Sequence, residues 1–203
     1  SARDRVKKWD LYVVSTAGGD VRRLTSDSML CDSPNISPDG NTIIYSRTPA
    51  EASSEICSVP FNGGTTRRIG FGYTPKWSPD GKRIGYLGVE SGIAEFWTIN
   101  SDGTENRLEF NDSVGSKVDE WYAFAWSSDG RSVAWVRNLQ KNHSEIVIHD
   151  LETGFERPVI SDTSFKNEIC WAPNDQLIYS SSVKDEKHLW MVPATGGVPV
   201  QIT

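Results

Sequence analysis

The sequence predicts an all-β fold, a β-propeller built from four-stranded antiparallel blades, because two turn motifs alternate along the chain and recur at the length of one blade. The first motif is most complete at Trp77-Ser78-Pro79-Asp80-Gly81. Successive copies are separated by 41, 49 and 45 residues, counted at Asp39, Asp80, Asp129 and Asn174. A β-sandwich is the alternative, but the strands of a sandwich do not normally repeat so strictly.

The first motif predicts a hairpin turn between the two inner strands of a blade, a and b. Proline presets the backbone φ for the second position of a type I turn, and glycine accepts the left-handed conformation that closes the hairpin. β-Branched and aromatic residues follow the turn, as in Ile43-Ile44-Tyr45 and Ile84-Gly85-Tyr86, which is typical of a paired inner strand. No stretch of the chain has a convincing helical period.

The second motif predicts the outer strands, c and d. Each of five apolar segments leads to a turn glycine, and an aliphatic residue follows five positions later: the segments are Leu11–Val14, Ile56–Val59, Phe96–Ile99, Ile146–His149 and Leu189–Val192, and the aliphatic residues are Leu24, Ile69, Leu108, Val159 and Ile202. A polar column precedes these segments, at Asp10, Glu55, Glu95, Glu145 and His188. Because it recurs in every blade, this column predicts a hydrogen bond or ion pair between neighbouring elements. A catalytic carboxylate pair would be expected once.

The motif count predicts a partial propeller, four full blades plus a half blade, because five c–d pairs stand against four a–b pairs. We expect the half blade, with strands c and d, at 1–25, and the blades at 26–69, 70–109, 110–160 and 161–203. An open ring would leave strand edges and an inner face unpaired, which folded proteins avoid. We therefore expect these blades to be part of a larger ring, or to be completed by a second chain.

The segments Trp77–Tyr86 and Gly18–Thr25 resemble the TolB-type (WD40-like) β-propeller repeat, and the resemblance covers essentially the whole chain. Such repeats are specific for fold and occur in many unrelated proteins. The resemblance implies a parent ring of six or more blades and an extracytoplasmic location, periplasmic or secreted. The sequence departs from the repeat at Ile36, Ser128, Asn174-Asp175 and Arg157-Pro158.

Composition disfavours several classes of partner. The net charge is −6, and no block of Lys or Arg stands out, so a nucleic acid is not expected as a partner. No apolar run reaches the length of a membrane span, so direct membrane insertion is not expected. The three cysteines, Cys31, Cys57 and Cys170, include no CxxC element and predict neither a disulfide framework nor a zinc site.

The motifs of catalysis and cofactor binding are not found. The chain has no G-x-S-x-G elbow, no P-loop and no dinucleotide fingerprint, so we predict no catalytic residue and no cofactor. His143, His149 and His188 have no partner at ligand spacing, and we predict no metal site.

The connections b–c and d–a are the predicted binding surface, because they vary while the a–b and c–d turns on the opposite face are short and stereotyped. The longest d–a connection ends in Asp119, Glu120, Trp121 and Tyr122, an acidic pair followed by two aromatic anchors. The b–c connections add Arg47, Glu90 and His143 as candidates. Alternatively, Trp121 and Tyr122 begin an inner strand and pack between blades.

Two functions of different class follow. The first is a non-catalytic binding module that presents the b–c and d–a loops to a protein, peptide or glycan. The alternative is the propeller domain of a prolyl-oligopeptidase-family serine peptidase, which related repeats form, with its catalytic domain outside this chain. A G-x-S-x-G elbow downstream of Thr203 would distinguish them. A sensor domain would need an upstream membrane span, and a lyase for acidic sugars would need a His-rich metal site.

Overall fold

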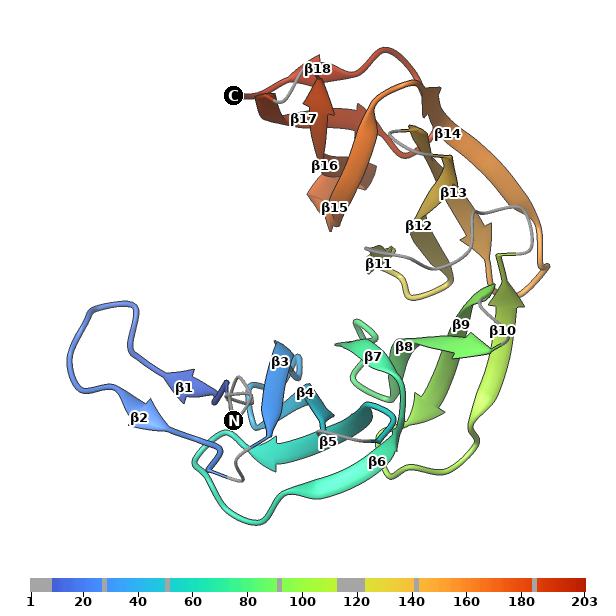
Figure 1. Ribbon diagram of the computed structural model, residues 1–203. Coiled ribbons are helices and arrows are strands. Elements are labelled where there is room, and N and C mark those ends of the chain that lie inside the picture. Colours follow the sequence, from blue (N-terminus) through green and yellow to red (C-terminus); the bar gives the residue numbers. More distant parts are fainter. Residues whose placement is uncertain are drawn as a thin grey trace, which may run out of the picture. The chain divides into compact units, whose positions relative to one another are not determined.

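A computed structural model gives the arrangement of the chain, and it describes residues 9–26, 29–49, 52–90, 93–112, 123–140, 143–183 and 186–203. It confirms the predicted fold class: the chain is all-β, with four four-stranded antiparallel sheets and a two-stranded sheet that precedes them (Figure 1). In each sheet the strands are neighbours in the order in which the chain visits them, which is the order expected for a propeller blade.

The strands of each sheet have the following bounds. The two-stranded sheet holds β1 (Tyr12–Val13) and β2 (Arg22–Arg23). The four-stranded sheets hold β3 (Leu30–Ile36), β4 (Thr42–Thr48), β5 (Glu55–Pro60) and β6 (Arg67–Phe71); β7 (Tyr73–Trp77), β8 (Arg83–Glu90), β9 (Ile93–Asn100) and β10 (Arg107–Asn111); β11 (Phe124–Trp126), β12 (Ser132–Gln140), β13 (His143–Asp150) and β14 (Glu156–Asp162); and β15 (Phe165–Ala172), β16 (Gln176–Val183), β17 (Glu186–Pro193) and β18 (Val200–Gln201).

The Ser and Asp of the first motif have roles in the turn that its Pro and Gly do not supply. Ser37 Oγ donates to Asp39 Oδ1 at 2.5 Å, and the same oxygen accepts from Asn41 N at 3.0 Å. Ser37 Oγ in turn accepts from Thr42 N at 2.9 Å, so two side chains satisfy the backbone of the turn. Gly40 closes the turn with a φ of +75°.

The shortened fourth copy of this motif forms a short 3₁₀ turn, η1 (Pro173–Asp175). It has no glycine, and Asn174 and Asp175 take the left-handed conformation themselves, with φ of 61° and 53°. Asn and Asp tolerate that conformation better than other residues with a side chain. The departure from the repeat therefore changes the turn and leaves the hairpin intact.

The chain divides into two compact units, each with its own core. The first comprises Ser1–Trp77, Gly81–Gly88 and Trp97–Arg107, and the second comprises Ser78–Asp80, Val89–Phe96 and Leu108–Thr203. In the first unit, Ile43 and Tyr45 belong to one apolar cluster and Ile44 to another. Successive side chains of a strand point to opposite faces, so β4 is buried on both faces and has no polar alternation in its sequence.

The second unit has an apolar cluster and an aromatic one. The apolar cluster joins side chains of β11 to β17, including Val136, Ile146 and Leu177. The aromatic cluster surrounds Phe96, whose ring centroid lies 5.0 Å from that of Phe124 and 6.3 Å from that of Trp135. Edge-to-face contacts of this kind stabilise a core beyond the area they bury.

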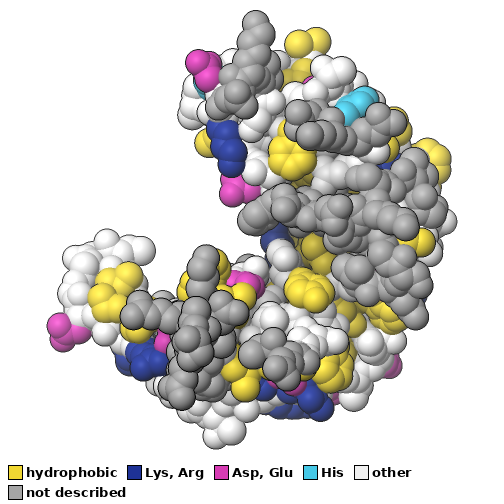
Figure 2. Space-filling view, in the orientation of Figure 1, with side chains coloured by type: hydrophobic (Ala, Val, Ile, Leu, Met, Phe, Trp, Pro, Cys, Tyr) yellow, Lys and Arg dark blue, Asp and Glu magenta, His cyan; other side chains and the backbone are white. Residues whose placement is uncertain are grey.

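Charge is distributed over the surface. On the face shown in Figure 2, Lys and Arg side chains lie in separate small groups with acidic side chains near some of them. No helix within the described ranges is long and apolar enough to cross a membrane.

Candidate binding surface

The polar column before strand c makes the contacts that its repetition predicts. Arg47 Nε and Nη2 donate to Glu55 Oε2 at 3.0 and 2.6 Å, and Arg68 Nη1 donates to Glu55 Oε1 at 3.2 Å. Burial opposes ionisation of Glu55, but the hydrogen bonds from the two arginines outweigh it and lower the pKa of that carboxyl. Strands b, c and d of the blade are thereby tied together beside its b–c connection.

Other members of the column hold their blades in the same way. Arg23 Nη2 donates to Asp10 Oδ2 at 2.6 Å, and Arg137 Nη1 donates to Glu145 Oε1 at 3.0 Å. His188 Nδ1 lies 2.9 Å from the carbonyl oxygen of Thr203. The column is structural at these positions, as the sequence predicts.

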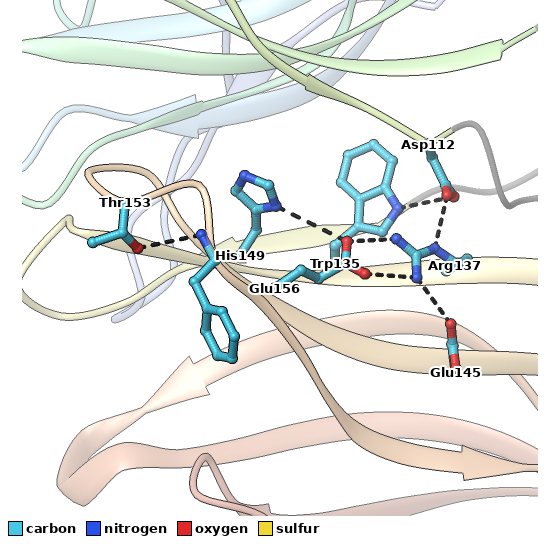
Figure 3. A network of polar contacts seen from close by, with 8 residues as sticks. Asp112, Trp135, Arg137, Glu145, His149, Thr153 and Glu156 are labelled. Carbon is cyan, nitrogen blue, oxygen red and sulfur yellow. Dashed lines mark hydrogen bonds and ion pairs between the residues drawn. The ribbon is translucent and has the colours of Figure 1, made fainter.

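Arg137 is the centre of a larger polar network (Figure 3). Its Nε donates to Asp112 Oδ1 at 2.7 Å, and its Nη1 and Nη2 donate to the two carboxylate oxygens of Glu156 at 2.9 and 2.5 Å. Trp135 Nε1 also donates to Asp112, at 3.3 Å. The network therefore joins strands β12, β13 and β14 to Asp112, the residue that follows β10.

One guanidinium faces three carboxylates in this network. The side chain of Arg137 is 8% exposed and that of Asp112 is 0% exposed, whereas Glu156 is 35% exposed. Burial alone would lower the pKa of Arg137, but the carboxylates outweigh it and raise that pKa far above its ordinary value. Arg137 therefore stays charged, and the network fixes the start of the longest d–a connection.

His149 lies at the edge of this network as a packed aromatic ring. Its ring centroid lies 4.0 Å from that of Phe110, with the planes 24° apart, and its Nδ1 lies 3.9 Å from Glu156 Oε2. Burial lowers the pKa of His149, although the neighbouring carboxylates act in the opposite direction. In the part of the chain that the structure describes, no group of three or more His, Cys, Asp or Glu residues could hold a metal ion.

Lys166 is a buried cation that the sequence reasoning missed. Its side chain is 0% exposed, and its Nζ donates to Asp162 Oδ1 at 2.7 Å and to the carbonyl oxygen of Ser144 at 2.8 Å. Burial lowers the pKa of Lys166, while Asp162 raises it in part. Asp162, four residues before Lys166 in the sequence, is the local signal for this pair.

The predicted binding residues lie in different sheets. Arg47 lies near the end of β4, Glu90 is the last residue of β8, and His143 is the first residue of β13 and is partly buried. All three therefore border b–c connections, as predicted. Asp119, Glu120, Trp121 and Tyr122 lie outside the described residues.

Two pockets lie in the second unit. The first, which we call the loop-edge pocket, has a volume of about 270 Å³ and is lined by Asp162, Ser164, Tyr179, Ser181 and Trp190 among others. Burial, followed by the charge of Asp162, raises the pKa of Tyr179 to about 12. The second, which we call the turn-edge pocket, has a volume of about 440 Å³. It lies against the a–b turn after β11 and the c–d turn after β17, with lining residues that include Asp129, Phe155, Arg157, Trp171 and Thr195.

Sequentially ordered four-stranded blades, Ser-Pro-Asp-Gly turns and ion pairs beneath the b–c connections define a β-propeller with the TolB-like fold. The structure resembles the crystal structure of TolB from Acinetobacter baumannii with a TM-score of 0.77 and 19% identity, covering 96% of this chain and 48% of that chain. No family model matches the chain.

Sequence relatives include a peptidase and a TolB protein. The chain is 31% identical to Dipeptidyl-peptidase 5 of Porphyromonas gingivalis over 139 residues. The matched region is 63% of this chain and 20% of that protein. The chain is 26% identical to the Tol-Pal system protein TolB of Anaeromyxobacter dehalogenans over 118 residues. This matched region is 56% of this chain and 26% of that protein. The chain thus spans less than half the length of each of these three proteins.

Proposed function

We propose that this chain is a non-catalytic propeller module that binds a protein or peptide through its b–c and d–a connections. The observation that carries the proposal is that the d–a connections differ greatly in length, although the blades that they join have the same four strands. One residue separates β6, which ends at Phe71, from β7, which begins at Tyr73, whereas β10 ends at Asn111 and β11 begins at Phe124. Variable segments on a rigid scaffold are the usual place for recognition.

The base of the longest connection favours this assignment. The connection begins at Asp112, whose carboxylate is buried and held by Arg137 and Trp135. Asp112 therefore gives the connection a fixed starting point on the blade. Trp121 and Tyr122 would supply the aromatic anchors that dominate many interfaces.

A polypeptide is the favoured partner. The Anaeromyxobacter relative is named as a protein of the Tol-Pal system, which favours a protein partner for a chain of the same fold. A glycan is the other ligand that aromatic side chains and carboxylates would suit.

The test uses a library of random 12-residue peptides displayed on phage and the 203-residue chain as bait. We expect selected peptides to bind Trp121→Ala at least tenfold more weakly, and to protect the backbone beside the b–c and d–a connections from hydrogen exchange. Tyr12→Ala is the matched control, because Tyr12 is 57% exposed and lies on β1. Equal binding by wild type and Trp121→Ala, with protection elsewhere, would contradict the proposal.

A second candidate is the propeller domain of a prolyl-oligopeptidase-family serine peptidase. The 31% identity to a dipeptidyl-peptidase favours it. The complete protein encoded by the open reading frame would then carry a G-x-S-x-G elbow and release dipeptides from fluorogenic substrates. A complete protein without that elbow and without turnover would exclude this candidate.

A further inference from the structure

Arginines on strand d bind the next blade through a backbone carbonyl. Arg22, on β2, donates from Nη2 to the carbonyl oxygen of Phe61 at 2.5 Å. Arg67, on β6, donates from Nη2 to the carbonyl oxygen of Asp102. Phe61 and Asp102 both lie in c–d turns, between β5 and β6 and between β9 and β10. Each arginine thus connects the end of one sheet to the c–d turn of the sheet that follows.

Arg157 is the counterpart of these arginines on β14. Arg22, Arg67 and Arg157 each follow the second-motif glycine by three residues. Arg157 lines the turn-edge pocket together with Ala194 and Thr195, which lie in the c–d turn of the next sheet. Arg157 therefore has the same position in the repeat as Arg22 and Arg67, and it lies beside the c–d turn of the following sheet, as they do.

The contact itself is not made at Arg157. The side chain is partly buried, yet among the described residues its guanidinium has no hydrogen-bond or ion-pair partner. A guanidinium carries five N–H donors, and those of Arg157 are free to bond an acceptor that enters the pocket. Where the other two arginines donate to a carbonyl oxygen, Arg157 lines a pocket of about 440 Å³.

The other groups of the pocket restrict what can enter it. Asp129 Oδ1 accepts from Ser127 Oγ at 2.6 Å, and Asp150 Oδ1 accepts from Thr153 N at 2.7 Å, so both carboxylates serve their own turns. Their negative charges nevertheless remain and disfavour an anionic ligand. Phe155, which is 65% exposed, adds apolar surface at the rim. A neutral ligand with a strong acceptor and some apolar surface fits this combination.

We infer that the turn-edge pocket binds a polypeptide segment of a partner, with Arg157 donating to a backbone carbonyl oxygen of that segment. The same donor type, at the same position of the repeat, binds a backbone carbonyl twice within this chain. The side chains of Phe155 and Trp171 would cover the apolar part of the segment. This inference shares the polypeptide partner with the proposed function, but it assigns a second contact on the opposite, turn-bearing edge of the blades.

The first test compares thermal unfolding of Arg157→Gln and Arg67→Gln. Arg157→Gln removes no contact of the free chain, so its Tm should stay within about 1 °C of wild type. Arg67→Gln removes a cross-sheet hydrogen bond from a charged donor, so its Tm should fall by about 2–4 °C. An equal fall for the two variants would show that Arg157 is bonded within the chain and would overturn the inference.

The second test uses the displayed 12-residue peptides. Peptides that occupy the turn-edge pocket should bind Arg157→Gln at least tenfold more weakly and Arg67→Gln within twofold of wild type. Replacing the contacted carbonyl oxygen by sulfur, in a thioamide scan, should weaken binding to wild type at one position and have little effect on Arg157→Gln. Selected peptides that bind Arg157→Gln as tightly as wild type, or that depend on a side-chain carboxylate instead, would overturn the inference.

The two proposals fail separately. Peptides weakened by Trp121→Ala and not by Arg157→Gln would support the loop surface and overturn the turn-edge pocket. Peptides weakened only by Arg157→Gln would support the pocket and overturn the loop surface.

Discussion

Replacing Arg137 by Met should destabilise the chain more than removing an exposed charge such as that of Arg23. The substitution keeps most of the side-chain volume and removes the guanidinium that is bonded to Asp112, Glu145 and Glu156. Removing one partner of a buried ion pair costs about 3–5 kcal/mol, because the remaining charge is left buried without compensation. Glu156 is 35% exposed and can be hydrated, so the lower part of this range applies. For a chain of this size, Tm should fall by roughly 10 °C.

The assay is urea unfolding followed by tryptophan fluorescence, with the midpoint and the slope fitted together. Arg23→Met is the matched control, because Arg23 has a side chain 48% exposed and an ion pair with Asp10. Exposed pairs of that kind contribute up to about 1 kcal/mol. The double variant Arg137→Met, Asp112→Asn should recover roughly 1–2 kcal/mol, since it also removes the most deeply buried of the three carboxylate charges. Arg137→Met and Arg23→Met with midpoints that agree within error would refute the reasoning.

Three further predictions concern single positions. Burial raises the pKa of Asp32 despite its hydrogen bonds, so its ionised form is a cost at neutral pH. Asp32→Asn should raise the free energy of unfolding at pH 7, and the gain should vanish in urea titrations as the pH falls toward 3.8. Gly72→Ala should lower the free energy of unfolding by about 3 kcal/mol or more, because the φ of Gly72 is +151° and the new Cβ would lie 2.6 Å from the carbonyl oxygen of Leu87. Gly40→Ala, with open space around the new Cβ, should lower it by about 1–2 kcal/mol in the same unfolding assay. Because the pKa of His149 is lowered in the folded chain, the unfolded chain takes up this proton at a higher pH. The free energy of unfolding should therefore fall as the pH drops below about 6.5, and His149→Phe should remove that part of the pH dependence.

The blades could be predicted because their determinants are local in sequence. The Ser-Pro-Asp-Gly turn places its donors and acceptors within five residues, as Ser37, Asp39 and Thr42 show. Continuous apolar runs such as Ile43-Ile44-Tyr45 record burial on both faces of a strand. These turns and strands can therefore be predicted without knowing how one blade packs against the next.

The polar contacts between elements could not be predicted, because their partners are distant in sequence and depend on side-chain direction. Asp112 and Arg137 are 25 residues apart, and nothing in either local sequence indicates the other. Lys166 lies on β15, and only the structure shows that Ser144 and Asp162 satisfy its ammonium group. Asp10 and Glu55 are exceptions, because their recurrence in the polar column predicts a hydrogen bond or ion pair, although it does not identify the partner residues.

Departures from the repeat carry more information about function than the repeat itself, and the sheet of β11 to β14 shows why. In the sheet of β3 to β6, Arg68 pairs opposite Cys57 and donates to Glu55; in the later sheet, Pro158 pairs opposite Val147 in the corresponding place. Proline has no side-chain donor, so this second arginine contact is lost.

The loss at Pro158 reverses the charge balance of the site. Glu55 accepts from two arginines, whereas Arg137 serves three carboxylates, Glu145 among them. The neighbour of that proline is Arg157, the arginine with no partner in the described chain, and it lines the turn-edge pocket of the same sheet. A single local change in the motif thus accompanies both a buried acidic network and an arginine without a partner among the described residues. Pro158→Arg, which restores the Arg-Arg found at Arg22-Arg23 and Arg67-Arg68, should therefore add an ion pair to Glu145 and leave peptide binding at Arg157 unchanged. Arg157→Gln should weaken that binding at least tenfold without affecting the network.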